Sequence, residues 1–226
     1  MEKHVVSKKR VSDHGEVYTR KREVNAMLDL VKQETERIES RFLEPACGKG
    51  NFLVEVLERK LRIVESRYKK SQLEYERYAV LAVSSIYGID ILEDNINDCR
   101  NRLFYIFDQQ YSSIFQKKAK NECRNAVKYI LERNIILGDA LSLKTIGNDP
   151  QPIIFSEWSL VRGSMIKRRD FAFHELMARE KKKQMTLFFD PGVFQKSDLG
   201  EDVFIPDPVK EYPLTHFLRI MDVEQQ

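Results

Sequence analysis

The chain has 226 residues with 38 Lys and Arg against 35 Asp and Glu, and 42% of its residues are hydrophobic, a composition that excludes disorder throughout and predicts a globular domain. No apolar run approaches the roughly 18 to 20 residues that a membrane-spanning helix needs, and no apolar signal region follows the basic N-terminus. Three cysteines without a CxxC pair predict neither disulfides nor a zinc site, so we expect a cytoplasmic protein without membrane association or bound metal.

Four short apolar runs, rich in branched or aromatic residues, occur along the chain at 41–45, 87–91, 134–140 and 152–156. Segments with helical spacing of apolar residues lie around them, at 21–38, 49–60, 67–83, 93–112 and 115–132. Strands that alternate with helices predict a parallel sheet with helices on both faces. We therefore expect an α/β, Rossmann-like fold that is incomplete or has a divergent C-terminal part.

Composition divides the chain into three expected parts. Residues 1–40 form a basic and then helical N-terminal segment, 41–160 hold the Rossmann-like core, and 161–226 form a basic and then acidic extension. Within this extension, Thr186–Gly192 is compatible with a short strand. We expect an irregular tail because three prolines interrupt it, at positions 206, 208 and 213.

A basic run opens the C-terminal extension. Lys167, Arg168 and Arg169 are followed by interleaved aromatic residues, a pattern that predicts contacts with DNA phosphates. A solvated face, or an amphipathic helix docked on a partner, is the alternative interpretation.

A turn with two glycines follows the first apolar run. From Phe42 the chain reads FLEPACGKGNFL: a strand, an acid, a turn with Gly48 and Gly50, and a helix that begins near Asn51. Glycine permits backbone conformations closed to other residues, and the first turn of a helix offers free N–H groups to a ligand. Leu53 replaces the third glycine of a dinucleotide site, and no G-K-[ST] phosphate loop is present. A turn with a purely structural role is the competing interpretation.

This turn resembles the cofactor motif of S-adenosylmethionine-dependent adenine-N6 DNA methyltransferases of restriction-modification systems, D/N/E-P-A-C-G-S-G-N-F-L, with Lys49 in place of the serine. Upstream, Gly15-Glu-Val-Tyr-Thr is similar to the family's first motif, although Arg20 replaces its proline. Downstream, Gly88-Ile-Asp-Ile resembles the second acidic motif and Leu137-Gly-Asp-Ala-Leu the third. The order of the four motifs is the family's gamma order.

The resemblance implies S-adenosylmethionine as the cofactor and DNA as the substrate. It implies that Tyr18 and Thr19 line the methionine end and that Glu44 faces the methionine amino group. Asp90 would accept hydrogen bonds from the ribose, as acids at this place in doubly wound folds do, and Asp139 from the adenine amino group. An N-cap for Asp90 and a turn aspartate for Asp139 are the structural alternatives. The remaining implied cofactor contacts are Pro45, Ala46, Gly48, Gly50, Asn51, Ile91 and Ala140.

The family's catalytic motif, [DNS]-P-P-[YFW], is missing, because the sequence contains no Pro-Pro pair. At the fourth apolar run, where it belongs, the chain reads Ser156-Glu-Trp-Ser. Trp158 is our candidate for a ring that stacks on a flipped base, with Ser156 or Glu157 as acceptor for the target amino group. A Trp that closes the core is the alternative. Asp190-Pro-Gly is more typical of a turn than of this motif.

Two functions follow as hypotheses. The first is an adenine-N6 DNA methyltransferase, or the methylation subunit of a restriction-modification or defence system, whose catalytic motif is divergent or supplied by a partner. The second is a cofactor-binding module without transfer activity that acts as a regulatory or structural subunit. We expect DNA, and a methylation, specificity or nuclease subunit, as partners. A methyltransferase acting on RNA, protein or a small molecule ranks below both, because the glycine motif is closer to the DNA enzymes.

Overall fold

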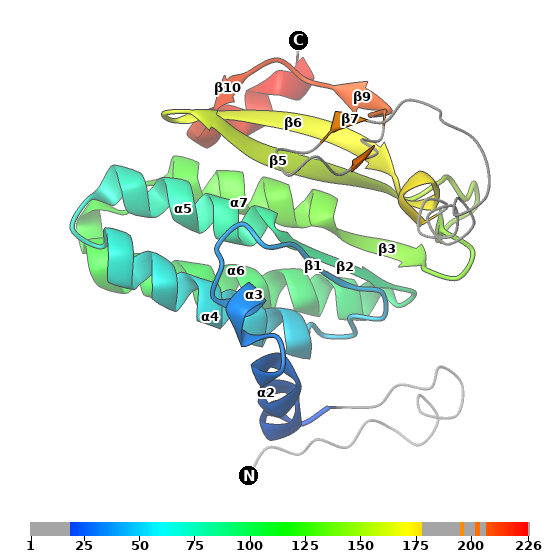
Figure 1. Cartoon of the computed structure of the whole chain (residues 1–226), viewed down its shortest axis with the longest axis horizontal. Helices are drawn as coiled ribbons and strands as arrows, with labels where there is room; N and C mark the ends of the chain where they lie inside the picture. Colours follow the sequence, from blue (N-terminus) through cyan, green and yellow to red (C-terminus); the bar gives the residue numbers. More distant parts are fainter. Residues whose placement is uncertain (1–18, 178–194, 197–201, 204–206, 226) are drawn as a thin grey trace.

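The computed structural model describes residues 19–177, 195–196, 202–203 and 207–225 (Figure 1). The predictions for Tyr18, for the strand at Thr186–Gly192 and for the turn at Asp190 therefore concern residues outside the described part. No helix within the described part is long and apolar enough to cross a membrane. The same residues contain no group of three or more His, Cys, Asp or Glu side chains that could hold a metal ion.

Two helices connect the first two parallel strands. β1 (Phe42–Glu44) is followed by α4 (Asn51–Tyr68) and α5 (Gln72–Ser84), and α5 leads directly into β2 (Ile86–Asp90). α4 forms because its apolar residues recur at helical spacing, and the buried ones face the core: Leu53, Leu57, Leu61 and Val64. β1 and β2 pair in parallel, with Phe42 opposite Ile86.

The second crossover repeats this arrangement. α6 (Glu93–Phe115), the short 3-10 helix η1 (Gln116–Lys118) and α7 (Asn121–Asn134) lead directly into β3 (Ile135–Asp139), which pairs in parallel with β2. Figure 1 shows the consequence: α5 and α7 lie in one layer with β2 and β3, and α4 and α6 lie beneath this layer. From residue 19 onwards, two short helices precede the sheet, α2 (Lys21–Asp29) and α3 (Lys32–Thr35).

A buried lysine fixes the segments that lead into β1 and β2. Lys60, which is fully buried on α4, donates hydrogen bonds to the carbonyls of Ile38 (3.1 Å) and Ser40 and to the hydroxyl of Ser85 (2.6 Å). Burial lowers its pKa to about 7. Because these acceptors lie just before the two strands, the lysine helps to hold β1 and β2 in register.

The fourth apolar run does not continue the parallel sheet as predicted. It opens β5 (Ile154–Arg162), which pairs antiparallel with β6 (Met165–Ala172) in a separate sheet. The physical reason is the connection: a parallel strand needs a crossover of a dozen or more residues, usually helical. The segment after β3 contains only the short antiparallel strand β4 (Lys144–Thr145), and two residues separate β5 from β6.

The two faces of the parallel sheet are covered differently. α4 and α6 cover one face, whereas the second sheet covers the other. Tyr87 and Ile89 of β2 pack against Ile153, Phe155 and Phe173. The prediction of helices on both faces was therefore wrong for this second face, and the expected boundary at residue 160 falls within β5.

The C-terminal residues 207–225 are ordered into short elements rather than irregular as predicted. β9 (Lys210–Glu211) and β10 (Thr215–His216) pair with β6, and the 3-10 helix η2 (Phe217–Gln225) packs on α7. β7 (Gln195–Lys196) pairs antiparallel with β8 (Asp202–Val203) in a separate two-stranded sheet. The tail is held because Phe217 and Ile220 are buried in the main core. The prolines interrupt the chain without preventing these contacts.

An ion-paired carboxylate makes the attachment of η2 sensitive to acid. Burial opposes the charge of Glu224, but Arg133 and Arg168 outweigh it and lower its pKa to about 2. Because the pKa is depressed on folding, this group stabilises the fold above its ordinary pKa of 4.5, and the contribution is lost as the pH falls towards 2. We expect Glu224→Gln to reduce the pH dependence of the unfolding free energy in this window. Denaturant titrations at pH 2 to 6 measure the unfolding free energy of the wild type and the variant. The same dependence on pH for both proteins would contradict the prediction.

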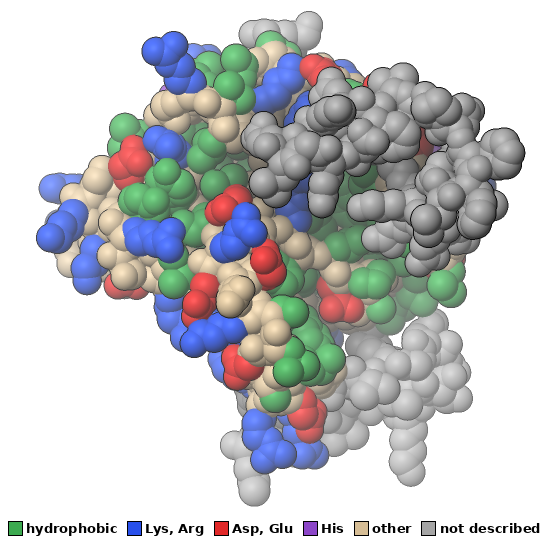
Figure 2. All heavy atoms as spheres, viewed as in Figure 1, with side chains coloured by type: hydrophobic (Ala, Val, Ile, Leu, Met, Phe, Trp, Pro, Cys, Tyr) green, Lys and Arg blue, Asp and Glu red, His purple; other side chains and the backbone are tan. Residues whose placement is uncertain are grey.

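Surface charges are mostly mixed in sign. Figure 2 shows acidic and basic side chains interspersed over the centre of this face, and Lys and Arg side chains at its left end, over the turn between α4 and α5.

Candidate cofactor site

The three acids of the resemblance lie at the carboxyl ends of neighbouring strands. Glu44 ends β1, Asp90 ends β2 and Asp139 ends β3. Because the strands are parallel and adjacent in the order β1-β2-β3, the three ends form one edge. This is the edge at which open α/β sheets bind their ligands.

The glycine turn between β1 and α4 uses its two glycines for different purposes. Both adopt left-handed backbone conformations, with φ +50° at Gly48 and φ +78° at Gly50. A Cβ at Gly50 would lie 2.5 Å from the sulfur of Cys99 on α6, so this position allows the turn to pack closely on α6. A Cβ at Gly48 would meet nothing within 4 Å. The backbone at Gly48 therefore faces open space from which a ligand can approach.

We expect Gly50→Ala to destabilise the fold by about 2 to 4 kcal/mol, because it adds steric overlap with Cys99 to the cost of a left-handed alanine. Gly48→Ala should cost only about 1 to 2 kcal/mol, since it has only the backbone cost. Chemical denaturation measures both.

A double variant separates the two contributions at Gly50. In a Cys99→Ala background, Gly50→Ala should lose less stability, because the steric overlap with the sulfur is absent. The comparison is between the double variant and Cys99→Ala alone. If Gly48→Ala and Gly50→Ala lower the unfolding free energy equally, the contact with Cys99 does not contribute to the effect at Gly50.

Two side chains of α6 hold the turn, and sequence reasoning missed both. Asp98 forms an ion pair with Lys49 (2.7 Å), which explains how a lysine is accommodated at this position. Arg102 donates to the Lys49 carbonyl (2.5 Å) and to the side-chain oxygen of Asn51 (2.8 Å). Asn51 in turn donates to the Thr19 carbonyl (3.5 Å). The available signal was the spacing of four residues between Asp98 and Arg102, which places both on one face of the predicted helix.

Asp90 connects the glycine turn to the second strand. Its carboxylate accepts hydrogen bonds from the backbone N–H of Gly48 (2.9 Å), the backbone N–H of Leu92 (2.9 Å) and the side chain of Asn95 (3.1 Å). The N-cap residue of α6 is Leu92, so Asp90 supports this helix start from two residues upstream. A carboxylate has about four acceptor positions, which leaves capacity for a further donor.

Asp139 and Glu44 differ in electrostatic environment. Asp139 accepts from the backbone N–H groups of Leu141 (2.9 Å) and Ser142 (3.3 Å), and these bonds lower its pKa. Asp139 thus makes the hydrogen bonds of a turn aspartate, and its carboxylate lies at the end of β3. Burial raises the pKa of Glu44, which lies half-buried at the end of β1.

Exposed apolar side chains stand beside the acids. Ile91, directly after Asp90, is 44% exposed, and Leu141, two residues after Asp139, is 95% exposed. Sequence reasoning included Ile91 and missed Leu141. Large apolar side chains that remain exposed at a polar edge are suited to contact a flat, apolar surface of a ligand.

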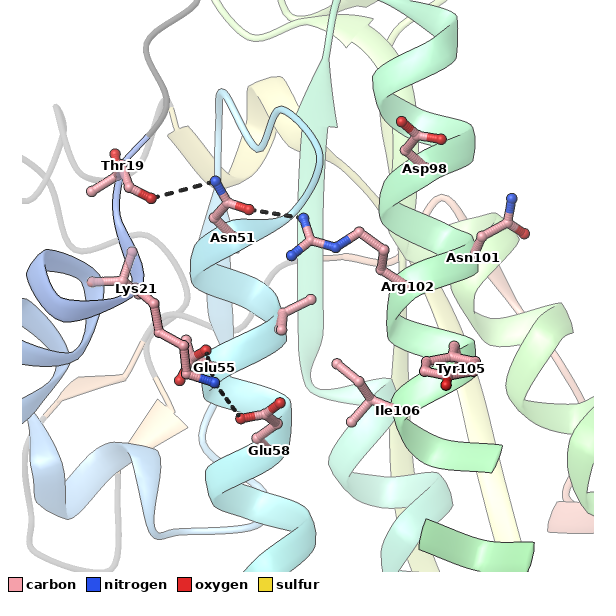
Figure 3. A pocket seen from close by; sticks show the side chains of 12 residues that line it. Thr19, Lys21, Asn51, Glu55, Glu58, Asp98, Asn101, Arg102, Tyr105 and Ile106 are labelled. Carbon is pink, nitrogen blue, oxygen red and sulfur yellow. Dashed lines mark hydrogen bonds and ion pairs between the residues drawn. The ribbon is translucent and has the colours of Figure 1, made fainter. Parts of the chain in front are cut away.

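A cavity of about 710 Å³ adjoins the turn on its outer side, between α2, α4 and α6. Thr19 and Asn51 are the predicted site residues that line it. Figure 3 shows Lys21 beside Glu55 and Glu58 on one wall and Arg102 of α6 across from them. None of the three strand-end acids lines this cavity. It is therefore separate from the strand-end edge, and its lining charges are largely paired with one another.

The structure places the three catalytic candidates away from the strand ends. Trp158 is buried on β5, and its indole N–H donates to Asn134 (3.2 Å), the residue directly before β3. It thus lies near the amino end of β3, whereas the candidate cofactor site is at the carboxyl end. The structure contradicts the predicted stacking role, because a fully packed indole at the opposite end of the strand cannot meet a flipped base there.

The two candidate acceptors on the same strand are also engaged. Ser156 is buried and donates to Asp170 (2.7 Å). Glu157 forms ion pairs with Arg41 and Arg169. Neither side chain reaches a strand end that carries a predicted cofactor residue.

The basic run on β6 is used within the protein. Arg168 is 8% exposed and bonds to Asp170 and Glu224, so a phosphate contact is not available to it. Arg169 pairs with Glu157 (2.8 Å) and Lys167 pairs with Glu211 (2.9 Å). The prediction of DNA contacts on this strand failed because the neighbouring strand and the C-terminal segment supply carboxylates that the sequence did not place there.

Comparison with known proteins gives two matches of consequence. The family of the MmeI DNA-methyltransferase domain matches residues 18–149. DNA methyltransferase A of Bacillus subtilis (strain 168) is 34% identical over 92 residues, which are 39% of this chain and 10% of that protein. The chain thus spans about a tenth of the length of this curated relative. No solved structure matches.

The matched region contains the structural features described above. Residues 18–149 include the glycine turn, the parallel strands β1, β2 and β3 and the three acids at their ends, and they stop before β5. Because the match covers more than half of the chain, the chain belongs to the family of the MmeI DNA-methyltransferase domain.

Proposed function

We propose that this chain binds S-adenosylmethionine at the carboxyl ends of β1, β2 and β3 and serves as the cofactor-binding part of an adenine-N6 DNA methyltransferase in a cytoplasmic restriction-modification or defence system. The observation that carries the proposal is the shared edge formed by Glu44, Asp90 and Asp139 around a glycine turn whose backbone at Gly48 faces open space. Membership of a DNA methyltransferase domain family supports it.

The residues at this edge fit the chemical groups of the cofactor. Asp90 has acceptor capacity left for a ribose hydroxyl, and Asp139 offers a carboxylate to an exocyclic amino group. The exposed side chains of Ile91 and Leu141 offer apolar surface to a purine ring. Glu44 offers its carboxylate to the methionine amino group. When bound, the cofactor supplies an electrophilic methyl group, and these residues bind and orient it.

Methyl transfer to adenine also needs groups that hold the target amino group beside the methyl carbon. The candidates on β5 lie elsewhere, and the sequence has no Pro-Pro pair. We therefore propose that a second polypeptide, a methylation, specificity or nuclease subunit, supplies the catalytic motif. Within the described part, β1 pairs only with β2 and forms the edge of its sheet, where an additional strand can join.

A second candidate function has its own support. The burial of Trp158 and the missing Pro-Pro pair favour a cofactor-binding module that has no transfer activity and acts as a regulatory or structural subunit. Both candidates require the same cofactor site, so they differ only in whether methyl groups reach DNA.

Two measurements test these proposals in sequence. Calorimetric titration with S-adenosylmethionine should show micromolar binding, and no detectable binding would overturn both candidates. Next, the chain is incubated with duplex DNA and the cofactor, alone and together with the products of neighbouring genes, and the nucleosides are analysed by mass spectrometry. N6-methyladenine supports the methyltransferase. Its absence in every combination, with cofactor binding intact, assigns the inactive module.

A further inference from the structure

Five cations gather at the end of the molecule opposite the strand-end edge. They come from two turns that lie about fifty residues apart in sequence: Arg67, Lys69 and Lys70 at the α4–α5 turn, and Lys117 and Lys118 at the α6–α7 turn. We call these five side chains the hairpin tip. All five residues are exposed, and the left end of Figure 2 shows Lys and Arg side chains over the α4–α5 turn.

A buried hydrogen-bond cluster holds the two turns together. Glu76 is fully buried and accepts from Tyr111 (2.5 Å), Gln72 (2.7 Å) and Lys120 (2.8 Å). Gln72 also donates to the carbonyl of Lys118 (2.7 Å), which ties the start of α5 to the α6–α7 turn. The hairpin tip is therefore one surface with a fixed arrangement of its backbone.

The positive charge of the hairpin tip is not neutralised within the described part of the chain. Its side chains form no ion pair with the described acids. Two of the acids close to it in sequence are engaged elsewhere: Glu74 pairs with Arg77 (3.2 Å) and Glu65 accepts from Gln110 (2.6 Å). In contrast, Lys167, Arg168 and Arg169 of β6 each form an ion pair within the protein. Exposed positive charge without an ion pair is thus a property of the hairpin tip and not of β6.

We propose that the hairpin tip binds the phosphate backbone of double-stranded DNA. Packed helices lie about 8 to 10 Å apart, so the two turns present cations at a separation comparable with the roughly 12 Å width of the major groove. Such an arrangement can contact phosphates of both strands, and membership of a DNA methyltransferase domain family favours DNA over a lipid surface as the source of these phosphates. The inference rests on the proposed function only in taking DNA as the substrate.

The position of the hairpin tip indicates the kind of contact. α4 has 18 residues and begins at the glycine turn, which places the tip about 27 Å from the cofactor edge. A phosphate contact at this distance does not read the target base, so it contributes affinity and salt dependence rather than sequence specificity.

The test compares two variants with the same loss of charge. The tip variant carries Lys69→Gln, Lys70→Gln, Lys117→Gln and Lys118→Gln. The control variant removes four exposed cations elsewhere, through Arg22→Gln, Lys32→Gln, Arg162→Gln and Lys210→Gln. Binding of the full chain to a fluorescent 20-base-pair duplex of arbitrary sequence is measured by anisotropy between 50 and 200 mM salt.

For the tip variant, we expect the slope of log affinity against log salt to become shallower by about 3 to 4, with at least tenfold weaker binding at low salt. The control variant should keep the wild-type slope. Equal slopes for the two variants would overturn the proposal. So would binding to phosphatidylserine vesicles that is lost in the tip variant while DNA binding is unchanged, because this assigns the surface to a membrane.

Cofactor titration separates this proposal from the proposed function. The tip variant should bind S-adenosylmethionine as the wild-type chain does, because α4 places the tip at its far end. If the wild-type chain binds no cofactor but its DNA binding is weakened in the tip variant, the proposed function is wrong and the present inference is supported.

Discussion

Replacing both Asp90 and Asp139 by alanine is expected to weaken binding of S-adenosylmethionine by at least 100-fold. Each carboxylate offers a charged hydrogen bond to the ligand, and the loss of two such bonds corresponds to about two to four powers of ten in affinity. Asp90 also holds the N–H of Gly48, so its loss releases the glycine turn. Isothermal titration calorimetry of wild type and variant measures the effect.

The control for this experiment is an aspartate away from the strand ends. Asp149→Ala removes one exposed carboxylate from the loop before β5 and should leave cofactor affinity unchanged. The double variant Asp90→Asn, Asp139→Asn keeps the size of both side chains and removes their charges. If the alanine variant is folded and binds the cofactor like the wild type, the strand-end edge is not the cofactor site.

Arg168→Ala is expected to destabilise the fold by about 3 to 5 kcal/mol, because it leaves the buried carboxylate of Asp170 without the cation that pairs with it. The guanidinium donates to Asp170 (2.7 Å), Glu224 (2.6 Å) and the hydroxyl of Tyr129 (2.9 Å). It also stacks over Tyr212, with 4.1 Å to the ring centre. At about 2 to 4 °C per kcal/mol, the melting temperature should fall by roughly 6 to 20 °C.

The neighbouring lysine provides the matched control. Lys167 pairs with Glu211 at the surface, where both side chains are partly exposed, so Lys167→Ala should cost no more than about 1 kcal/mol. A loss for Arg168→Ala as small as that of the control would mean that Arg168 is a surface cation. It would then again become a candidate for DNA contact.

Local patterns in the sequence predicted the parallel half of the fold. The apolar runs that became β1, β2 and β3 were found to within a few residues, because buried parallel strands are short, continuous and apolar. The helices between them were found because each keeps an apolar face at a spacing of three and four residues. The glycine turn and the acids at the strand ends could be read for the same reason: each follows its strand directly in the chain.

Features that depend on contacts between distant segments could not be predicted from local patterns. Trp158 and Arg168 looked functional as local patterns, yet Asn134 and Glu224, which are remote in sequence, bind them into the core. The family could be identified from the sequence motifs, and the parallel strands and the position of the proposed cofactor edge could be predicted from periodicity and adjacency. The antiparallel second sheet, the ion pairs that occupy β6 and the hairpin tip arise from long-range packing, which no local pattern encodes.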